Sequence, residues 1–163
     1  MLRTDEAFLL DSTRLGEADL ILTLFAREAG TVRGVARSAK KSRKRFGGAL
    51  EPMSRVRVSW KEQAGRDLHR IDSLDLLESF ADMQSDPEMQ SACGDLAEIT
   101  RTLVGENDPD DRFFRLLAAV LKAMQDGLGP FAAVRYFEFW ALKIQGMLPD
   151  LNRCGGCHAG RDS

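Results

Sequence analysis

The sequence predicts an α+β protein in which a small five-stranded barrel of the OB type precedes an all-α helical domain. Five short β-prone runs, separated by turn residues, occupy about the first 80 residues, as in a small closed barrel. The hydrophobic period then changes to that of amphipathic helices, punctuated by Asp-Pro and Gly-Pro pairs. We therefore expect an OB-fold domain at residues 1–80 and a helical domain at residues 81–163, joined near residues 79–85.

The five predicted strands cover residues 6–13, 18–25, 31–36, 54–60 and 68–76. The second run is apolar on both faces, which favours a central strand of a closed barrel over a sheet with one solvated face. The fourth run alternates Val and Trp with Arg and Ser, as expected where one face points to a core and the other to water. Its Trp60, like Phe25 in the second run, is in phase with apolar neighbours and is predicted to lie in the core.

Three helices are predicted in the second half. Asp86-Pro87 is a strong helix start, since Asp caps free amides and Pro tolerates the first helical position. Apolar residues then recur every three or four positions until Gly105. Asp108-Pro109 and Gly129-Pro130 open two further amphipathic helices, which end near Gly127 and Gly146. Together the three helices should bury one shared core.

Charge is distributed unevenly along the chain. The formal net charge is only −2, but residues 1–80 hold 15 Lys and Arg against 12 Asp and Glu, whereas residues 81–163 hold 8 against 13. Such asymmetry suggests that the first half faces a polyanion. The N-terminal residues lack the apolar core of a signal peptide, and no run approaches the roughly 18 apolar residues of a membrane span. We therefore expect a cytoplasmic protein that does not bind membranes.

The most informative feature is the basic segment, which we define as residues 33–45. It contains seven cations, and no acidic residue occurs between Glu28 and Glu51. Such density is self-repelling and becomes favourable when a polyanion neutralises it. We interpret the segment as a phosphate-binding site; a solvated loop or a docking site for an acidic partner are the alternatives. Its cations are Arg33, Arg37, Lys40, Lys41, Arg43, Lys44 and Arg45.

Neighbouring residues extend the predicted DNA-binding site. Arg55 and Arg57 should emerge on one solvent face of their strand, as in the grooves of proteins that bind single strands. Phe46 follows the basic segment directly and is the best candidate to stack on a base. Arg66 and Arg70 would extend the same cationic surface, although each is also an ordinary surface residue.

The motif Cys154-Gly-Gly-Cys157-His158 has the spacing of a haem c attachment site, but that chemistry belongs to exported proteins. Half of a zinc site fits better, since two glycines let both thiolates reach one metal. Four ligands are needed, so zinc would require further ligands beyond residue 163, and no cofactor is expected with certainty. Cys93 lies on an apolar helical stripe and is predicted to be core.

Enzymatic chemistry finds little support. The two histidines, His69 and His158, have no nucleophile or paired carboxylate near them in sequence, and no phosphate-binding or dinucleotide motif occurs. Three aspartates cluster near residue 110, but at a helix start, where acids cap and complement the helix dipole. We therefore expect a binding protein and not an enzyme, with no catalytic residue.

Several segments together resemble the bacterial recombination mediator family RecO. They are residues 30–37, 41–43 and 50–52 in the first half, and residues 136–142, 146–149 and 154–157 in the second. The resemblance runs over essentially the whole chain, and it implies an OB-fold, a helical domain and, in many members, a zinc site. It also implies that the protein binds single- and double-stranded DNA and anneals complementary strands. It further implies that the protein acts together with RecR and the single-strand-binding protein to load the recombinase RecA.

The resemblance carries over only to matching positions. The cations between Arg33 and Arg45 fall where the family binds DNA on its OB-fold. Cys154 and Cys157 match the first pair of the family's zinc ligands, whereas the second pair is absent from this sequence. A protein-interaction adaptor is the alternative function, in which the basic segment docks an acidic partner or the acidic tail of the single-strand-binding protein and DNA binding is secondary.

Overall fold

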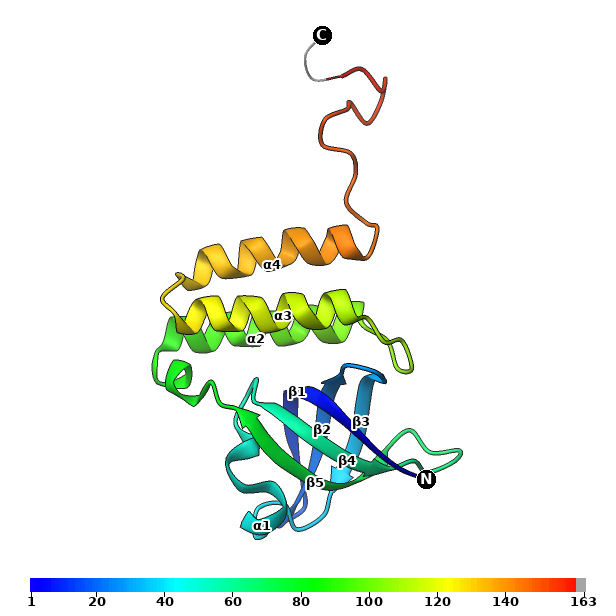
Figure 1. The fold of residues 1–163 in the computed structure, drawn as a ribbon, viewed down its shortest axis with the longest axis vertical. Helices are drawn as coiled ribbons and strands as arrows, with labels where there is room; N and C mark the ends of the chain where they lie inside the picture. The colour runs from blue at the N-terminus through cyan, green and yellow to red at the C-terminus, as the bar shows by residue number, and fades with distance from the viewer. Residues whose placement is uncertain (161–163) are drawn as a thin grey trace.

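The structure, a computed structural model, describes residues 1–160 and consists of a closed barrel below a bundle of helices (Figure 1). The strands are β1 (Leu2–Leu15), β2 (Asp19–Ala26), β3 (Gly30–Ala36), β4 (Arg55–Lys61) and β5 (His69–Glu78). They close in the order β1-β2-β3-β5-β4, with β3 and β5 parallel and the other pairs antiparallel. The predicted α+β class, with an OB-type barrel before helices, is confirmed.

Alternation along each strand fills the barrel. Leu20, Leu22 and Leu24 of β2 point inward, and Val56, Val58 and Trp60 of β4 meet them from another wall. Each of these side chains is at most 7% exposed, which explains why both strands read as core in the sequence. β1 is longer than expected because it pairs with β2 and β4 in turn, and its register shifts between Leu9 and Asp11.

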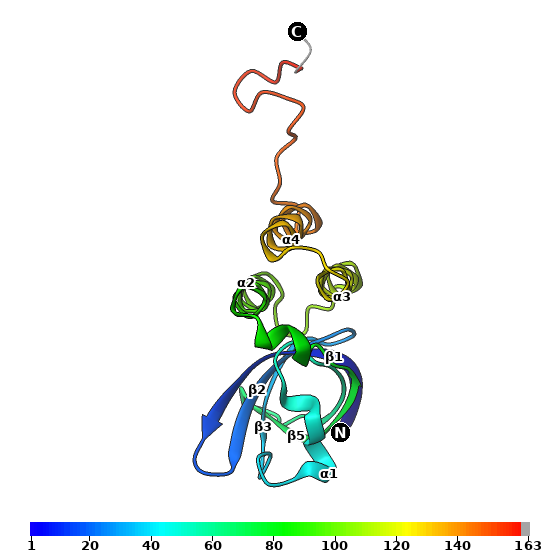
Figure 2. The same cartoon turned by 90° about the vertical axis from the view of Figure 1, so that its left-hand side faces the viewer.

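A short helical segment closes the end of the barrel that faces away from the helices (Figures 1 and 2). It comprises α1 (Arg43–Phe46) and the 3-10 turn η1 (Gly47–Leu50). The sequence indicated only a gap of basic and small residues here. Phe46 is 0% exposed and belongs to the core inside the barrel, so α1 is held by the side chain that it inserts.

The helices are α2 (Pro87–Leu103), α3 (Asp111–Gln125) and α4 (Pro130–Ile144), preceded by the 3-10 turn η2 (Ala81–Ser85). Asp86 caps α2 as predicted, its side chain accepting from the Glu88 amide at 2.9 Å. α3 begins later than the predicted Asp108-Pro109 because Asp110 is the cap that accepts from the Phe113 amide. α2 and α3 lie next to the barrel, and α4 forms the outer layer (Figure 2).

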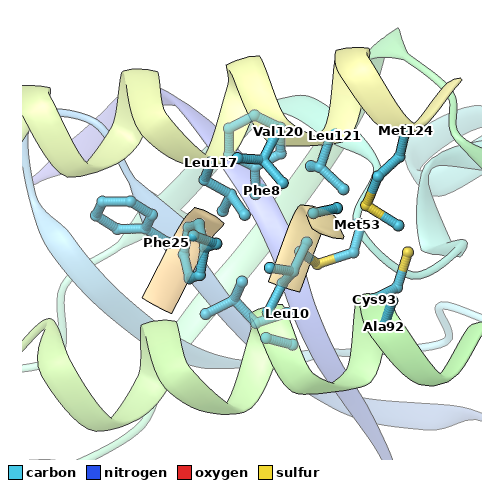
Figure 3. Packing of buried hydrophobic residues seen from close by; sticks show 14 of the residues in the cluster. Phe8, Leu10, Phe25, Met53, Ala92, Cys93, Leu117, Val120, Leu121 and Met124 are labelled. Carbon is cyan, nitrogen blue, oxygen red and sulfur yellow. The ribbon is translucent and has the colours of Figure 1, made fainter. Parts of the chain in front are cut away.

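Barrel and helices share one hydrophobic cluster. Phe8 and Phe25 point outward from β1 and β2 into the helices (Figure 3), where their rings meet those of Phe113 and Phe114 at centroid distances of 4.9 to 5.8 Å. Arg27, just after β2, also pairs with Asp111 at 2.6 Å. Phe25 is therefore core, as predicted, but on the outer side of the barrel. The division into two domains at residue 80 stays a prediction.

Cys93 is buried on α2, and burial raises the pKa of its thiol, in agreement with the predicted core position. Among residues 1–160, every helix is too short or too polar to cross a lipid bilayer.

Candidate nucleic-acid interface

The cations of the basic segment lack acidic partners. Elsewhere on the surface, Arg27, Arg101 and Arg115 pair with carboxylates at 2.6 to 3.6 Å. Within residues 1–160, by contrast, no carboxylate oxygen lies within 4.0 Å of any of the seven cations between Arg33 and Arg45. The segment thus presents uncompensated positive charge, which attracts polyanions.

The chain after β3 forms a compact turn that packs against the loop between β1 and β2. The Ser38 amide donates to Asp19 Oδ1 at 2.7 Å, and the Lys40 amide donates to the Ala18 carbonyl oxygen at 3.3 Å. The Ser42 amide donates to the Ser38 carbonyl oxygen at 3.0 Å, and Ser42 is the residue directly before α1. We call residues 37–45 the basic turn. Its backbone is held in place, while the side chains of Lys40, Lys41, Arg43 and Lys44 are exposed.

Arg45 differs from the other cations of the basic turn because its guanidinium makes several contacts inside the protein, whereas Lys40 Nζ makes one long hydrogen bond, of 3.5 Å, to the Glu17 carbonyl oxygen. Nη2 donates to the Arg37 carbonyl oxygen at 2.6 Å, and Nε donates to Ser42 Oγ at 3.2 Å. The group also lies over the ring of Phe46, 5.1 Å from its centroid. Arg45 therefore links the end of β3 to α1 through these hydrogen bonds, and it also adds a positive charge to the basic turn.

The structure corrects the expectation for Phe46. A stacking platform must present a ring face to solvent, but Phe46 is 0% exposed and fills the barrel end. Sequence proximity to the basic segment was misleading because a four-residue helix turns successive side chains in different directions. Phe46 holds α1 in place and does not stack on a base.

Arg55 and Arg57 point out of the barrel as predicted, but they do not adjoin the basic turn. β5 separates β4 from β3 in the closed barrel. Arg55 pairs with Glu6 and with Glu78, and its guanidinium lies 6.0 Å from the Phe114 ring centroid. It therefore serves the contact between barrel and helices. Arg57 is exposed without a carboxylate partner in residues 1–160, at the register position between Glu6 and Asp75.

Arg33 lies in the middle of β3, four residues before the basic turn begins. It lines a hollow between the barrel and the end of α2, together with Arg101 and the acids Asp11, Glu98 and Glu106. The three acids outnumber the two arginines, and Arg101 already pairs with Asp11 at 3.6 Å. The hollow is therefore unfavourable for phosphate, and Arg33 is set apart from the cations of the basic turn. Arg66 and Arg70 lie instead on the side of the barrel where β3 ends, and line one cleft with Arg37.

The cysteine pair forms a tight turn near residue 160. The His158 amide donates to the Cys154 carbonyl oxygen at 2.9 Å, and the Cys154 amide donates to the Ala159 carbonyl oxygen at 3.0 Å. Hydrogen bonds from the Cys157 and Gly156 amides lower the pKa of the Cys154 thiol. The turn suits two zinc ligands, but residues 1–160 contain no group of three His, Cys, Asp or Glu side chains that could hold a metal. Zinc binding by Cys154 and Cys157 therefore stays a prediction, in which this turn would supply two of the four ligands.

An apolar surface on α4 was not foreseen from the sequence. Phe131, Tyr136, Phe139 and Leu142 are 37 to 77% exposed, and Arg135 lies over the Phe131 ring at 5.6 Å. The helical period predicted a buried stripe of Val134, Phe137, Trp140, Ala141 and Ile144 on this helix. Val134, Phe137 and Ala141 are buried as predicted, whereas Trp140 and Ile144 are half-buried. The period could not reveal that the opposite face is also apolar, because apolar residues on both faces of a helix weaken the contrast on which the period depends.

The chain matches two family models. Residues 1–80 match the model described as Recombination protein O N terminal, and residues 84–162 match Recombination protein O C terminal. Proteins named DNA repair protein RecO are similar over most of the chain. That of Koribacter versatilis is 41% identical over 96% of this chain and 64% of its own length. The protein of Anaeromyxobacter sp. strain K is 40% identical over 88% of this chain and 57% of its own length. The chain thus spans about three fifths of the length of these relatives.

Proposed function

The chain belongs to the recombination protein O family, and from this premise we propose that it binds DNA through the basic turn and takes part in DNA repair by holding strands together. The observation that carries the proposal is the absence of carboxylate partners for the cations of residues 33–45 within residues 1–160. Phosphates would supply the missing negative charge.

The proposed mechanism is electrostatic. Cations of the basic turn screen the phosphates of two strands, so that complementary bases can meet and anneal. No covalent step is involved, and the protein acts as a mediator and not as an enzyme. Incubation of labelled DNA with the protein and divalent ions should leave the strands intact; cleavage or joining would contradict this part of the proposal.

The direct test removes three exposed lysines of the basic turn. Lys40, Lys41 and Lys44 are changed to Ala, while Arg45 is kept because it holds the turn together. We expect the affinity for a labelled oligonucleotide and the annealing rate to fall by about tenfold or more at moderate salt. The control variant changes three cations of α3 to Ala, namely Arg112, Arg115 and Lys122. Its affinity and its annealing rate should stay within about twofold of the wild-type values. Equal affinities for the two variants would refute the basic turn as the DNA site.

Family membership also suggests protein partners. We propose that the protein works with RecR to load RecA onto single strands that the single-strand-binding protein covers. Addition of this protein and RecR should shorten the lag of RecA assembly on such strands. Assembly kinetics that do not depend on this protein would contradict the proposal.

A second candidate function is supported by α4. Its exposed face combines the apolar side chains of Phe131, Phe139 and Leu142 with Arg135 and Lys143. A peptide with acidic and apolar residues, such as the tail of the single-strand-binding protein, complements such a surface. Changing Phe131 and Phe139 to Ala should weaken binding of that peptide but not of the oligonucleotide. Displacement of peptide by oligonucleotide would place both on the basic turn instead.

A further inference from the structure

A cleft on the side of the barrel adjoins the basic turn. It has a volume of about 560 Å³ and lies between the β1–β2 loop and the β4–β5 loop, over the end of β3 and the start of β5. Val35 and Leu68 contribute apolar surface, and Arg37, Arg66 and Arg70 contribute the cations. A volume of this size is typical of pockets that hold a small organic group.

The charges around the cleft leave two cations available. Arg70 pairs with Asp72 at 3.1 Å. Arg37 and Arg66 have no carboxylate oxygen within 4.0 Å in residues 1–160. Of the acids in the lining, Asp67 is exposed, and Asp19 accepts the Ser38 amide. The cleft can therefore attract a phosphate while retaining an apolar surface.

His69 adds a polar group that the fold does not use. It lies at the start of β5 in the lining of the cleft, and its Nδ1 atom is buried without a hydrogen-bond partner in the described part of the chain. A buried polar atom without a partner is unfavourable, and a ligand that offers a hydrogen bond removes the penalty. The ring nitrogen can donate or accept, depending on its tautomer.

We propose that this cleft binds one unstacked nucleotide of a single strand. The base would pack against Val35 and Leu68 with an edge toward His69, and the adjoining phosphates would lie at Arg37 and Arg66. A base in a duplex enters such a cleft only if it leaves the stack, which costs a few kcal/mol. The inference rests on the proposed function and deepens it: the basic turn accepts single strands and duplexes, whereas the cleft selects single strands.

The cleft and the basic turn form one path. Arg37 lines the cleft, and its carbonyl oxygen is the acceptor for Arg45 of α1. A strand with one base in the cleft can therefore continue across the exposed side chains of Lys40 and Lys41 without crossing the acidic hollow near Arg33.

The test compares double variants that each remove two cations. Arg37 and Arg66 are changed to Ala in the cleft, and Arg112 and Lys122 are changed to Ala on α3 as the matched control. The Arg66→Ala single variant is a second test that should not unfold the protein, since the Arg66 side chain donates to Gln63 Oε1 of its own exposed loop, at 3.3 Å. Fluorescence anisotropy gives the affinity of each variant for a labelled single strand and for a blunt duplex of equal length.

We expect the cleft variant to bind the single strand about tenfold more weakly and the duplex less than about twofold more weakly. Equal losses for the two substrates, or no loss relative to the α3 control, would overturn the inference. In either of these cases, weaker binding by the variant that lacks Lys40, Lys41 and Lys44 would still support the proposed function. If that variant binds both substrates normally, the proposed function fails instead.

A strand with abasic sites isolates the contribution of the base, because its phosphates are unchanged. The wild-type protein should bind the abasic strand several-fold more weakly than the normal strand, and His69→Ala should narrow this difference. Equal binding of both strands by the wild-type protein would show that no base enters the cleft.

Discussion

Arg45 donates a hydrogen bond of 2.6 Å to the backbone carbonyl oxygen of Arg37 and thereby joins both ends of the basic turn. The same guanidinium contacts Ser42 Oγ and covers the ring of Phe46. One cation of the run is thus structural, while its neighbours remain free to meet a ligand.

The first prediction separates these two roles. Arg45→Ala should lower the free energy of unfolding by about 1 kcal/mol, since a charged hydrogen bond and a cation–π contact are lost at a partly exposed site. Lys44→Ala, one residue earlier and exposed, should change it by less than about 0.5 kcal/mol. Urea denaturation measures both values. If Lys44→Ala lowered the free energy of unfolding as much as Arg45→Ala, the contacts of Arg45 would not be what holds the turn.

The second prediction concerns salt. The logarithm of the association constant for a single strand should fall linearly with the logarithm of salt concentration. Removal of Lys40, Lys41 and Lys44 should make the slope shallower by about 2, if each lysine contacts one phosphate. Titrations at several salt concentrations give the slope. A reduced affinity with an unchanged slope would indicate that the lysines act through the fold and not through phosphates.

The third prediction concerns the join between barrel and helices. Gly30 has φ +73°, and a Cβ there would lie 2.7 Å from the Gly105 carbonyl oxygen and 2.8 Å from the backbone of Asp108. Gly30→Ala should therefore destabilise the protein by more than about 2 kcal/mol, through backbone strain and a clash that involves backbone atoms.

Gly16 supplies the control for Gly30. It has φ +71°, but within residues 1–160, its own two chain neighbours aside, no atom lies within 4 Å of the position that a Cβ would occupy there. Gly16→Ala therefore carries the strain without the clash and should cost about 1 kcal/mol. Thermal denaturation of the two variants compares them directly. Equal losses would show that the close approach of Gly30 to the 105–108 loop is not rigid.

The fourth prediction concerns thiol reactivity. Amide hydrogen bonds lower the pKa of Cys154 below its ordinary value of 9.0, whereas burial raises that of Cys93 above it. The fraction of thiolate at neutral pH is therefore larger at Cys154, and alkylation should proceed there first. Mass spectrometry after brief labelling at several pH values locates the modified residue, with Cys154→Ser as the control. Faster labelling of Cys93 in the native protein would contradict its burial.

The periodic parts of the fold could be predicted from the sequence, because each strand or long helix repeats its pattern several times. β2 and β4 alternate in the barrel wall as expected, and α2 carries its apolar stripe inward. α1 was missed because four residues are too few to show a period. Phe46 illustrates the consequence: its burial depends on the closure of the barrel, which no local pattern reports.

The candidate site was predictable in its charge but not in its geometry. Acid-free composition marks the basic segment, yet only the fold shows that Arg33 faces an acidic hollow and that Arg55 is paired at the helices. The cleft depends on the parallel pairing of β3 with β5, which brings Arg37 close to Arg66 and Arg70. The strand topology brings these residues together although they are far apart in the sequence. The alternation of residues within one strand gives no information about which strands are neighbours.

The aromatic contact of Phe8 and Phe25 with α3 has a consequence for how bound molecules are placed. Because this contact is apolar and buried, it fixes the barrel relative to the helices in the manner of a rigid spacer. The basic turn and the outer face of α4 lie on opposite sides of this contact (Figure 1). DNA bound at the basic turn and a peptide bound on α4 would therefore stay at a constant separation, so that both could remain bound while a strand is transferred from one protein to another.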